Sequence, residues 1–415
     1  MWRVGPGGKL LFVVLGLAIL AFTADRYLLG SKYLKRSGVF PERQVVLSGG
    51  DFPPGAAAPA SDVVRLPTRP FRLAAAPRGS AASLLLAAGG TGTRKDSPVS
   101  RAYGMEVDLA LLPDERAISD ALSTGGDRAG GVDAAVISVD RLAQVRASLR
   151  DLKLKTVLLV SRSRGHEALA GAAGVSQVAS LRGRKVAVPT RSAARFFLLW
   201  ELSQVPMSPS ALQIVAVASS ADAAHLFREA RVDAAVGDVA DLAASARERA
   251  GTLIATSADA PQLVATVLVV RAEFLARFPD AVRRLVRAQL DAADAIAREP
   301  TDGARLLAAS APQLGDPFEA LKADPPASLA ENLAFFDVRG DTPVRYEELF
   351  RSAVELWRKL GEPADETLPA DTRELGPLMA ASAAPPAPVP LPALRPIVPS
   401  PGSVIAPRLP DGSLP

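Results

Sequence analysis

The sequence predicts an α/β protein with two lobes. Strand-like apolar runs alternate with helix-like stretches of ten or more residues through the middle of the chain, at roughly 80–362. The phrase GGVDAAVISVDRLA at 130–143 returns as ARVDAAVGDVADLA at 230–243. Alternating strands and helices are typical of parallel sheets with right-handed crossovers. Because the phrase occurs once in each half, we expect one equivalent strand–helix unit in each lobe.

Each element is placed from short apolar runs and the turn residues that bound them. The strands expected in the first half are SLLLAA (83–88), MEVDLALL (105–112), DAAVI (133–137) and KTVLLV (155–160), with helices at 113–123 and 138–149. In the second half they are RKVAVP (184–189), QIVAVA (213–218), DAAVG (233–237), TLIAT (252–256) and QLVATVLVV (262–270). Helices are expected at 192–204, 220–230 and 238–250, followed by a helical block from 271 to about 360.

Composition excludes several classes of site. The 415 residues include no cysteine, so disulfides, thiolate nucleophiles, Cys-type metal sites and a lipoprotein anchor are excluded. The two histidines, His166 and His225, have no partner at metal-ligand spacing, so we expect no catalytic residue, metal or cofactor. The formal net charge of +4 is modest, and the Lys and Arg residues of the chain are interspersed with Asp and Glu. Nucleic acid is therefore not an expected partner.

Residues 1–30 are predicted to be a membrane anchor or a signal segment. The run LLFVVLGLAILAFTA (10–24) is apolar and uncharged. It is shorter than the about 20 residues that span a bilayer, and it suits a signal-peptide core equally well. Phe22 stands two residues before Ala24, where a cleavage site needs a small residue, so an uncleaved helix is favoured. The basic residues after the run outnumber those before it, which by itself would place the body in the cytoplasm.

Two segments rich in Pro, Ala and Gly flank the folded part. Residues 31–79 contain DFPPGAAAPAS and RLPTRP, and are predicted to form an extended linker. Residues 363–415 contain SAAPPAPVPLPALRPIVPS, where dense proline leaves no core-forming period. We expect that tail to be disordered or in polyproline II.

An ordered set of segments resembles a known family. They are SRGHEALAG (163–171), ASLRGRKVAVPTRSAARFFLLWEL (179–202), REARVDAAVGDVADL (228–242), LIATSADAP (253–261) and ATVLVVRAEFLARFPDAVRRLVRAQLDA (265–292). They resemble periplasmic substrate-binding proteins of the nitrate, taurine and aliphatic sulfonate importers of ABC type. The stretch at 328–361 is similar to a membrane-anchored branch that is often fused to an OmpA-like domain, and here the Pro-rich tail follows instead.

The resemblance implies a type II periplasmic-binding-protein fold with its ligand between the lobes. The first lobe would comprise 80–160 and 262–362, the second 161–261, and strands near 155–162 and 260–268 would form the hinge. It also implies an ABC permease as a partner and a body outside the cytoplasmic membrane. That implication outweighs the charge count, so we expect a single-pass inner-membrane protein with a periplasmic body.

The clearest candidate site lies after the strand at 184–189. Pro189 ends the strand and a helix begins at Ser192, so free backbone N–H groups and the hydroxyls of Thr190 and Ser192 converge. This arrangement suits an anion. A plain helix cap without a ligand remains the alternative.

Other candidates follow from the repeated strand and from a glycine pair. Ser138 and Asp238 each stand where a helix follows the repeated strand, so both can face a shared crevice. Asp238 would repel a simple anion and favour an amine. Gly90 and Thr91 follow the predicted strand at 83–88, where a backbone without side chains can approach a ligand, or merely turn. A ligand with both a negative and a donor group is permitted.

Three functions remain open. The leading one is the solute-binding component of an importer, which takes a small polar or anionic ligand such as a sulfonate or nitrate. The second is an envelope sensor or scaffold that uses the same fold without transport. The third is an enzyme on this fold, which would need His166 or His225 in the crevice.

Overall fold

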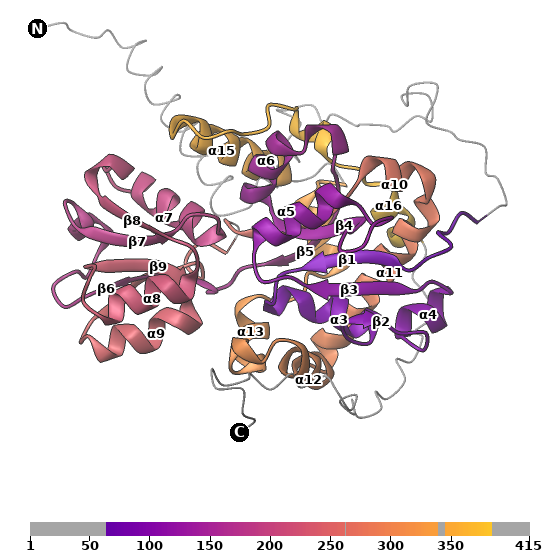
Figure 1. The fold of residues 1–415 in the computed structure, drawn as a ribbon, viewed down its shortest axis with the longest axis horizontal. Coiled ribbons are helices and arrows are strands. Elements are labelled where there is room, and N and C mark those ends of the chain that lie inside the picture. Colours follow the sequence, from indigo (N-terminus) through magenta and orange to yellow (C-terminus); the bar gives the residue numbers. More distant parts are fainter. Residues whose placement is uncertain (1–63, 262, 339–344, 384–415) are drawn as a thin grey trace, which may run out of the picture. The chain divides into compact units, whose positions relative to one another are not determined.

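The computed structural model describes residues 64–261, 263–338 and 345–383, which contain two β-sheets (Figure 1). Sheet A has the strand order β2-β3-β1-β4-β11-β5, and sheet B has the order β10-β6-β9-β7-β8. Sheet A comprises β1 (Phe71–Ala75), β2 (Gly92–Thr93), β3 (Val107–Leu111), β4 (Ala134–Ser138), β5 (Lys155–Arg162) and β11 (Ala265–Val270). Sheet B comprises β6 (Glu167–Gly171), β7 (Lys185–Pro189), β8 (Gln213–Val217), β9 (Ala234–Asp238) and β10 (Thr252–Thr256).

The repeated phrase forms equivalent strands in the two sheets, as predicted. In sheet A, β4 runs parallel to β1 with Ala134 opposite Leu73. In sheet B, β9 runs parallel to β7 with Ala234 opposite Val186. The Asp-Ala-Ala-Val sequence suits this position because small and β-branched side chains fit a strand that is covered on both faces. The two-lobe α/β fold is therefore confirmed, with sheet A and its helices as the first lobe and sheet B as the second.

The sheets are mixed, whereas the sequence pattern predicted parallel ones. β11 is antiparallel to both of its neighbours, β4 and β5. β6 is antiparallel to β9, and β10 is antiparallel to β6. For β11 the reason is topological, since the chain leaves sheet A at the end of β5 and returns at that same end of the sheet, so β11 runs in the opposite direction.

Helices cover the faces of each sheet (Figure 1). Those that follow strands of sheet A are α3 (Ala82–Ala88), α4 (Pro98–Tyr103), α5 (Glu115–Thr124) and α6 (Val139–Ser148). Sheet B carries α7 (Ala193–Ser203) on one face and α8 (Ser220–Arg228) and α9 (Val239–Glu248) on the other. The predicted helical block is α10 (Ala272–Arg277), α11 (Pro279–Arg298), α12 (Thr301–Ser310), α13 (Pro317–Ala323), α14 (Leu329–Phe335) and α15 (Arg345–Lys359), and α16 (Gly376–Ala383) follows it.

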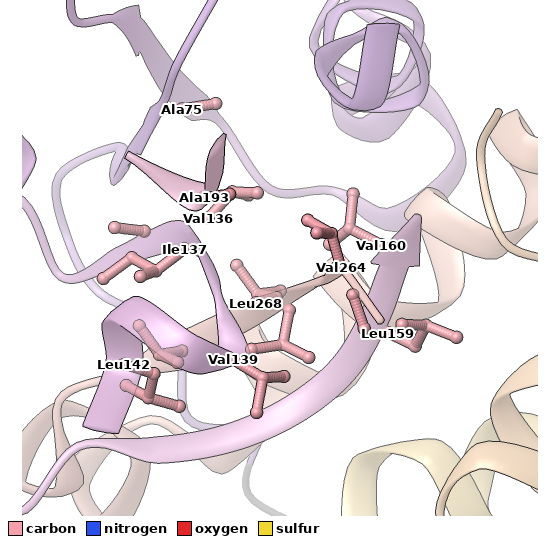
Figure 2. Close-up of a cluster of buried hydrophobic side chains, with 14 of the residues drawn as sticks. Ala75, Val136, Ile137, Val139, Leu142, Leu159, Val160, Ala193, Val264 and Leu268 are labelled. Carbon is pink, nitrogen blue, oxygen red and sulfur yellow. The ribbon is translucent and has the colours of Figure 1, made fainter. Parts of the chain in front are cut away.

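The main apolar core is continuous from sheet A to the start of α7. Figure 2 shows part of it, with Val136 and Ile137 of β4 near Leu268 of β11. Ala193, the first residue of α7, belongs to the same buried cluster. A second cluster lies within sheet B and includes Phe227. The amino end of α7 is thus held against the first lobe.

The predicted strand at 83–88 is wrong. Residues 82–88 form helix α3, which is buried on all sides and ends at Gly89 in the left-handed conformation, at φ 74°. A short apolar run carries no period when every face is covered, so it does not distinguish a buried strand from a buried helix. Glycine ends the helix because it adopts positive φ without steric cost.

Both predicted boundaries of the folded part are also wrong. The predicted linker 31–79 includes β1, where Phe71 and Leu73 are fully buried. The predicted tail 363–415 includes α16, whose Leu378 is fully buried. Pro70 and Pro77 lie close to the two ends of β1. A window of sequence that includes its five residues therefore has the composition of a linker, and the strand was missed.

The predicted anchor at 1–30 lies outside the described residues, as do the remaining parts of the linker and tail. Among the helices that the structure describes, none combines the length and apolar character that crossing a membrane requires.

Candidate functional site

The chain passes between the two sheets twice, and a pair of serines joins the two crossings. Residues 163–166 connect β5 to β6, and the second crossing connects β10 to β11. The Oγ atoms of Ser163 and Ser257 lie 2.7 Å apart, and both side chains are buried. Ser257 Oγ also accepts a hydrogen bond from the backbone N–H of Glu167, at 3.1 Å. The crossings therefore form one hydrogen-bonded unit at the base of the crevice, beside the hinge expected from the resemblance.

An arginine from the first lobe reaches a carboxylate of the second. Arg78 follows β1, and its Nη2 lies 2.5 Å from Oε1 of Glu167, the first residue of β6. Its Nε lies 3.6 Å from Asp324 Oδ2. The Glu167 side chain is 0% exposed and that of Arg78 is 20% exposed. Burial would raise the pKa of Glu167, but Arg78, His166 and the Ser163 hydroxyl outweigh it and lower that pKa.

His166 and Asp238 form a second polar pair beside Glu167. His166 Nε2 lies 3.3 Å from Asp238 Oδ1, the imidazole is buried and the carboxylate is 38% exposed. Burial and Arg78 lower the pKa of His166, yet Asp238 and Glu167 leave it raised overall. Burial would raise the pKa of Asp238, and His166 with Arg78 lowers it to about 2. The Asp238 carboxylate of this pair is therefore ionised at neutral pH.

A third group of charges lies at the first turns of α5 and α6. Arg141 donates to Glu115 through Nε. Asp140 is 1% exposed, and neither of its carboxylate oxygens has a hydrogen-bond partner of ordinary geometry among the described residues. Burial raises the pKa of Asp140 to about 7, and Glu115 and Glu167 add to the effect against the Ser138 hydroxyl and Arg141.

An open groove runs from this group to the loop after β7. Its volume is about 700 Å³, and its lining includes Glu115, Arg141, Thr190, Arg191 and Arg195. These residues come from both lobes. A small polar molecule fits a groove of this size.

The segment after α15 bonds to both lobes at the edge of this groove. Gln144 of α6 donates to Glu362 Oε2 at 2.6 Å, and Arg195 of α7 donates to Glu362 Oε1. The Arg195 guanidinium also lies 5.3 Å from the ring centroid of Trp357, which is fully buried. Trp357 Nε1 donates to the backbone oxygen of Asp140 at 3.0 Å.

Four of the predicted site residues stand at helix starts that follow strands. Ser138 and Asp238 are the N-cap residues of α6 and α9, and Ser192 is the N-cap of α7. None of the three side chains caps its own helix with a hydrogen bond. Thr190 is exposed, and its Oγ1 lies 3.4 Å from the Val217 oxygen. The hydroxyls of Ser138 and Ser192 have no hydrogen-bond partner of ordinary geometry among the described residues, whereas Asp238 is paired with His166. Helix N-termini are sites that bind polar groups.

Gly90 and Thr91 do not join the other predicted residues. They follow the C-cap of α3 and lead into β2, an edge strand that β3 and β1 separate from β4. Strands lie about 4.8 Å apart, so β2 is about 14 Å from β4 and from Ser138 at its end. Their prediction depended on a strand at 83–88, which the structure replaces with a helix.

Sequence reasoning missed the charged residues that lie where the two lobes meet. Arg78 lay in the predicted linker, and Glu167 lay in the segment SRGHEALAG, where no strand and no site residue were predicted. Asp140 resembles an ordinary acidic residue in a helical first turn, which the helix dipole favours. His166 was not predicted as a site residue, and it pairs with Asp238. Among the described residues, no group of three or more His, Asp or Glu side chains could hold a metal ion.

Comparison with known proteins agrees with this architecture. Residues 103–303 match the NMT1/THI5-like family. No curated protein sequence matches the chain. The resemblance predicted from the sequence is confirmed, because the NMT1/THI5-like region lies within a fold shared with solved binding proteins of ABC importers.

Three solved structures show this likeness. The ligand-binding component of an ABC-type import system from Staphylococcus aureus is 14% identical with a TM-score of 0.57, over 76% of this chain and 100% of that one. The alkanesulfonate-binding protein SsuA from Xanthomonas axonopodis pv. citri, bound to MOPS, is 15% identical with a TM-score of 0.55, over 75% and 100%. The desulfurization enzyme DSZB is 13% identical with a TM-score of 0.54, over 76% and 99%. At these identities the likeness shows the fold alone.

Proposed function

We propose that the protein is the extracytoplasmic solute-binding component of an ABC-type importer, and that it holds a small polar ligand between its two lobes. The observation that carries this proposal is the ion pair between Arg78 of the first lobe and the buried Glu167 of the second, which is bonded to Ser163 and Ser257 of the two crossings. Polar groups from two lobes that share a hinge can enclose a ligand when the lobes close. The names of the solved relatives support this class of function.

The ligand contacts that we propose are Thr190, Ser192, Ser138 and Asp238. The first two stand at the start of α7, where oriented N–H groups favour a negative or electron-rich group. Removing one hydroxyl should weaken binding by about 0.5–1.5 kcal/mol for a neutral group and about 1.5–3 kcal/mol for a charged one. Neither change removes a buried apolar group, so the fold should be retained.

The experiment is a melting series with the full chain. Sulfonates, nitrate, phosphate and small amines are added to the native protein and to its Ser192→Ala and Thr190→Ala variants. A ligand at one hundred times its dissociation constant stabilises the folded state by about 2.7 kcal/mol. The matched control is Ser210→Ala, in an exposed turn away from the crevice. A ligand whose shift neither site variant reduces would remove α7 from the proposed site.

We also propose that residues 1–30 tether the protein to the inner membrane with its body in the periplasm. This proposal depends on the apolar run at 10–24 and on the periplasmic location that the relatives' names state. Protease added to spheroplasts should digest the body and leave a membrane-bound fragment. Digestion only after lysis would place the body in the cytoplasm.

A second candidate is an enzyme on the same fold, and one observation favours it. His166 lies in the crevice with Asp238, an arrangement that can hold an imidazole ready to move a proton. Conversion of a bound sulfonate or amine by the native protein, lost in His166→Gln with binding retained, would establish it. Co-purification with a permease and no turnover would favour the importer over both the enzyme and a sensor or scaffold.

A further inference from the structure

We propose that the group recognised in the crevice is an organic cation, an ammonium or a guanidinium, and that the sulfonates and nitrate of the resemblance are poor ligands. This inference rests on the proposed function, because it names the ligand class of the same site. It follows from the balance of charges, from the acids at the helix starts and from one buried carboxylate.

Carboxylates outnumber cations where the two lobes meet. We use the name acidic cluster for five carboxylates, Glu115, Asp140, Glu167, Asp238 and Asp324. Arg78 interacts electrostatically with Glu115, Glu167, Asp238 and Asp324, and Asp140 interacts with Glu115 and Glu167. Two arginines and His166 face the acidic cluster, and His166 is paired with Asp238. Arg78 is paired with Glu167 and Asp324, and Arg141 is paired with Glu115. An added anion would find both arginines already neutralised, whereas an added cation would find carboxylates to spare.

The helix starts around the crevice already carry negative charge. Asp114 caps α5 by accepting from the Ala117 N–H at 2.8 Å, and Glu115 follows it. Asp140 stands in the first turn of α6, and Asp238 is the N-cap of α9. Each carboxylate satisfies the positive end of its helix dipole and repels a further anion. Of these four helices, α7 alone has no acid in its first turn.

The Asp140 carboxylate supplies the observation that points to a ligand. It is almost completely buried and lacks hydrogen-bond donors of ordinary geometry among the described residues. A buried acceptor without a donor costs about 1–3 kcal/mol, and more when charged. An ammonium offers three donors and a guanidinium offers five, so either would satisfy both oxygens. Burial raises the pKa of Asp140 to about 7, and the nearby Arg141 and the Ser138 hydroxyl lower it only in part.

The open groove reaches the acidic cluster at Glu115. Glu115 and Arg141 line that groove and also act on Asp140 electrostatically. The rest of its charged lining is Arg116, Asp120, Arg191, Arg195 and Glu362. A modest opening of the lobes at the Ser163–Ser257 crossing would widen the groove, since it has walls from both lobes. The alkyl part of the ligand would then lie along the groove and its charged end would face Asp140 and Asp238.

The test compares probes matched in length and opposite in charge. Primary alkylamines and alkanesulfonates of two to six carbons are each added to the full chain at pH 7.5 and constant ionic strength, and melting shifts and dissociation constants are measured. We expect at least one amine to raise the melting temperature, and the sulfonate of the same length to have at least tenfold weaker affinity. Asp238→Asn should weaken the amine at least tenfold.

Glu248→Gln is the matched control, because it removes one negative charge from the exposed last turn of α9, the helix that Asp238 begins. Its amine affinity should stay within twofold of the native value. If sulfonates bind and amines do not, the inference that the ligand is a cation is wrong, and the proposed function stands. Binding of neither series would count against both. Equal weakening by Asp238→Asn and Glu248→Gln would show attraction to overall charge and overturn the site.

Discussion

The guanidinium of Arg78, which follows the first strand of sheet A, lies 2.5 Å from the carboxylate of Glu167, the first residue of sheet B. The two residues are 89 positions apart in the chain. Because Glu167 is fully buried, its charge depends on this arginine for compensation. The ion pair is therefore a direct energetic connection between the lobes.

Arg78→Gln should destabilise the protein by about 3 kcal/mol, because it leaves the buried charges of Glu167 and Asp324 without their partner. Urea unfolding at pH 7 measures the loss. Arg191→Gln, at an exposed position in the open groove, should change stability by about 0.5 kcal/mol or less. The double variant Arg78→Gln with Glu167→Gln should recover part of the loss. A loss below about 1 kcal/mol for Arg78→Gln would show that the pair does not hold the lobes.

Relative to the native protein, Asp140→Asn should be more stabilising at pH 8 than at pH 4. Burial raises the pKa of Asp140 to about 7, and the charged groups that face it are Glu115 of α5, Arg141 of α6 and Glu167 of β6. The unfolded chain loses this proton near pH 4 and the folded chain near pH 7, so native stability falls across that window by a few kcal/mol. The variant lacks this decrease. The difference between native and variant unfolding free energies, measured from pH 4 to 8, should widen with pH, and a constant difference would contradict the assignment.

The His166–Asp238 pair should contribute most stability between about pH 4 and pH 6.5. The raised pKa of His166 means that its contribution is complete below its ordinary value and is lost as pH rises through the raised one. The lowered pKa of Asp238, about 2, means that its contribution is lost as pH falls toward that value. Asp238→Asn should reduce the change of the unfolding free energy with pH at both ends of this window, as measured by denaturant unfolding.

His225→Gln is the control for the His166–Asp238 pair, because His225 lies 3.1 Å from Glu229 on the exposed surface of α8. Exposed pairs contribute little. The pH profile of that variant should follow the native one. A matching change in both variants would mean that the buried pair has no special role.

Trp357→Ala should cost about 3–5 kcal/mol, since a fully buried indole leaves a large cavity. Trp357→Phe keeps most of the volume and loses the hydrogen bond to the Asp140 oxygen, for about 1 kcal/mol. Trp200→Phe, at a half-buried position of α7, should cost less than either. Denaturant unfolding of the three variants gives the order, and an equal loss for the two phenylalanine variants would remove the role of the indole N–H.

Local pattern predicted most of the fold. The repeated Asp-Ala-Ala-Val sequence predicted β4 and β9 because a buried parallel strand needs small and β-branched residues, and Ser138 and Asp238 marked the helices that follow. The pattern failed where burial removed its period, at α3, and where prolines flanked a short strand, at β1. In both places tertiary contacts decide the structure, and a short window of sequence does not contain them.

The candidate site was less predictable than the fold. Thr190, Ser192, Ser138 and Asp238 could be found because strand-to-helix junctions leave backbone N–H groups free. The partnership of Arg78 with Glu167 could not be found, because it joins two lobes and has no local spacing. The missing donors of Asp140 are likewise a property of its three-dimensional surroundings.

Glu362 is bonded to α6 of the first lobe and to α7 of the second, and the segment behind it is fixed to the first lobe by the buried pair of Arg146 and Asp365. A separation of the lobes must therefore break the contact of Arg195 with Glu362. Because the contact is made only while the lobes are together, it stabilises that arrangement against the open one. Its strength would therefore set how often the lobes separate, and so how quickly any molecule held between them exchanges with solvent.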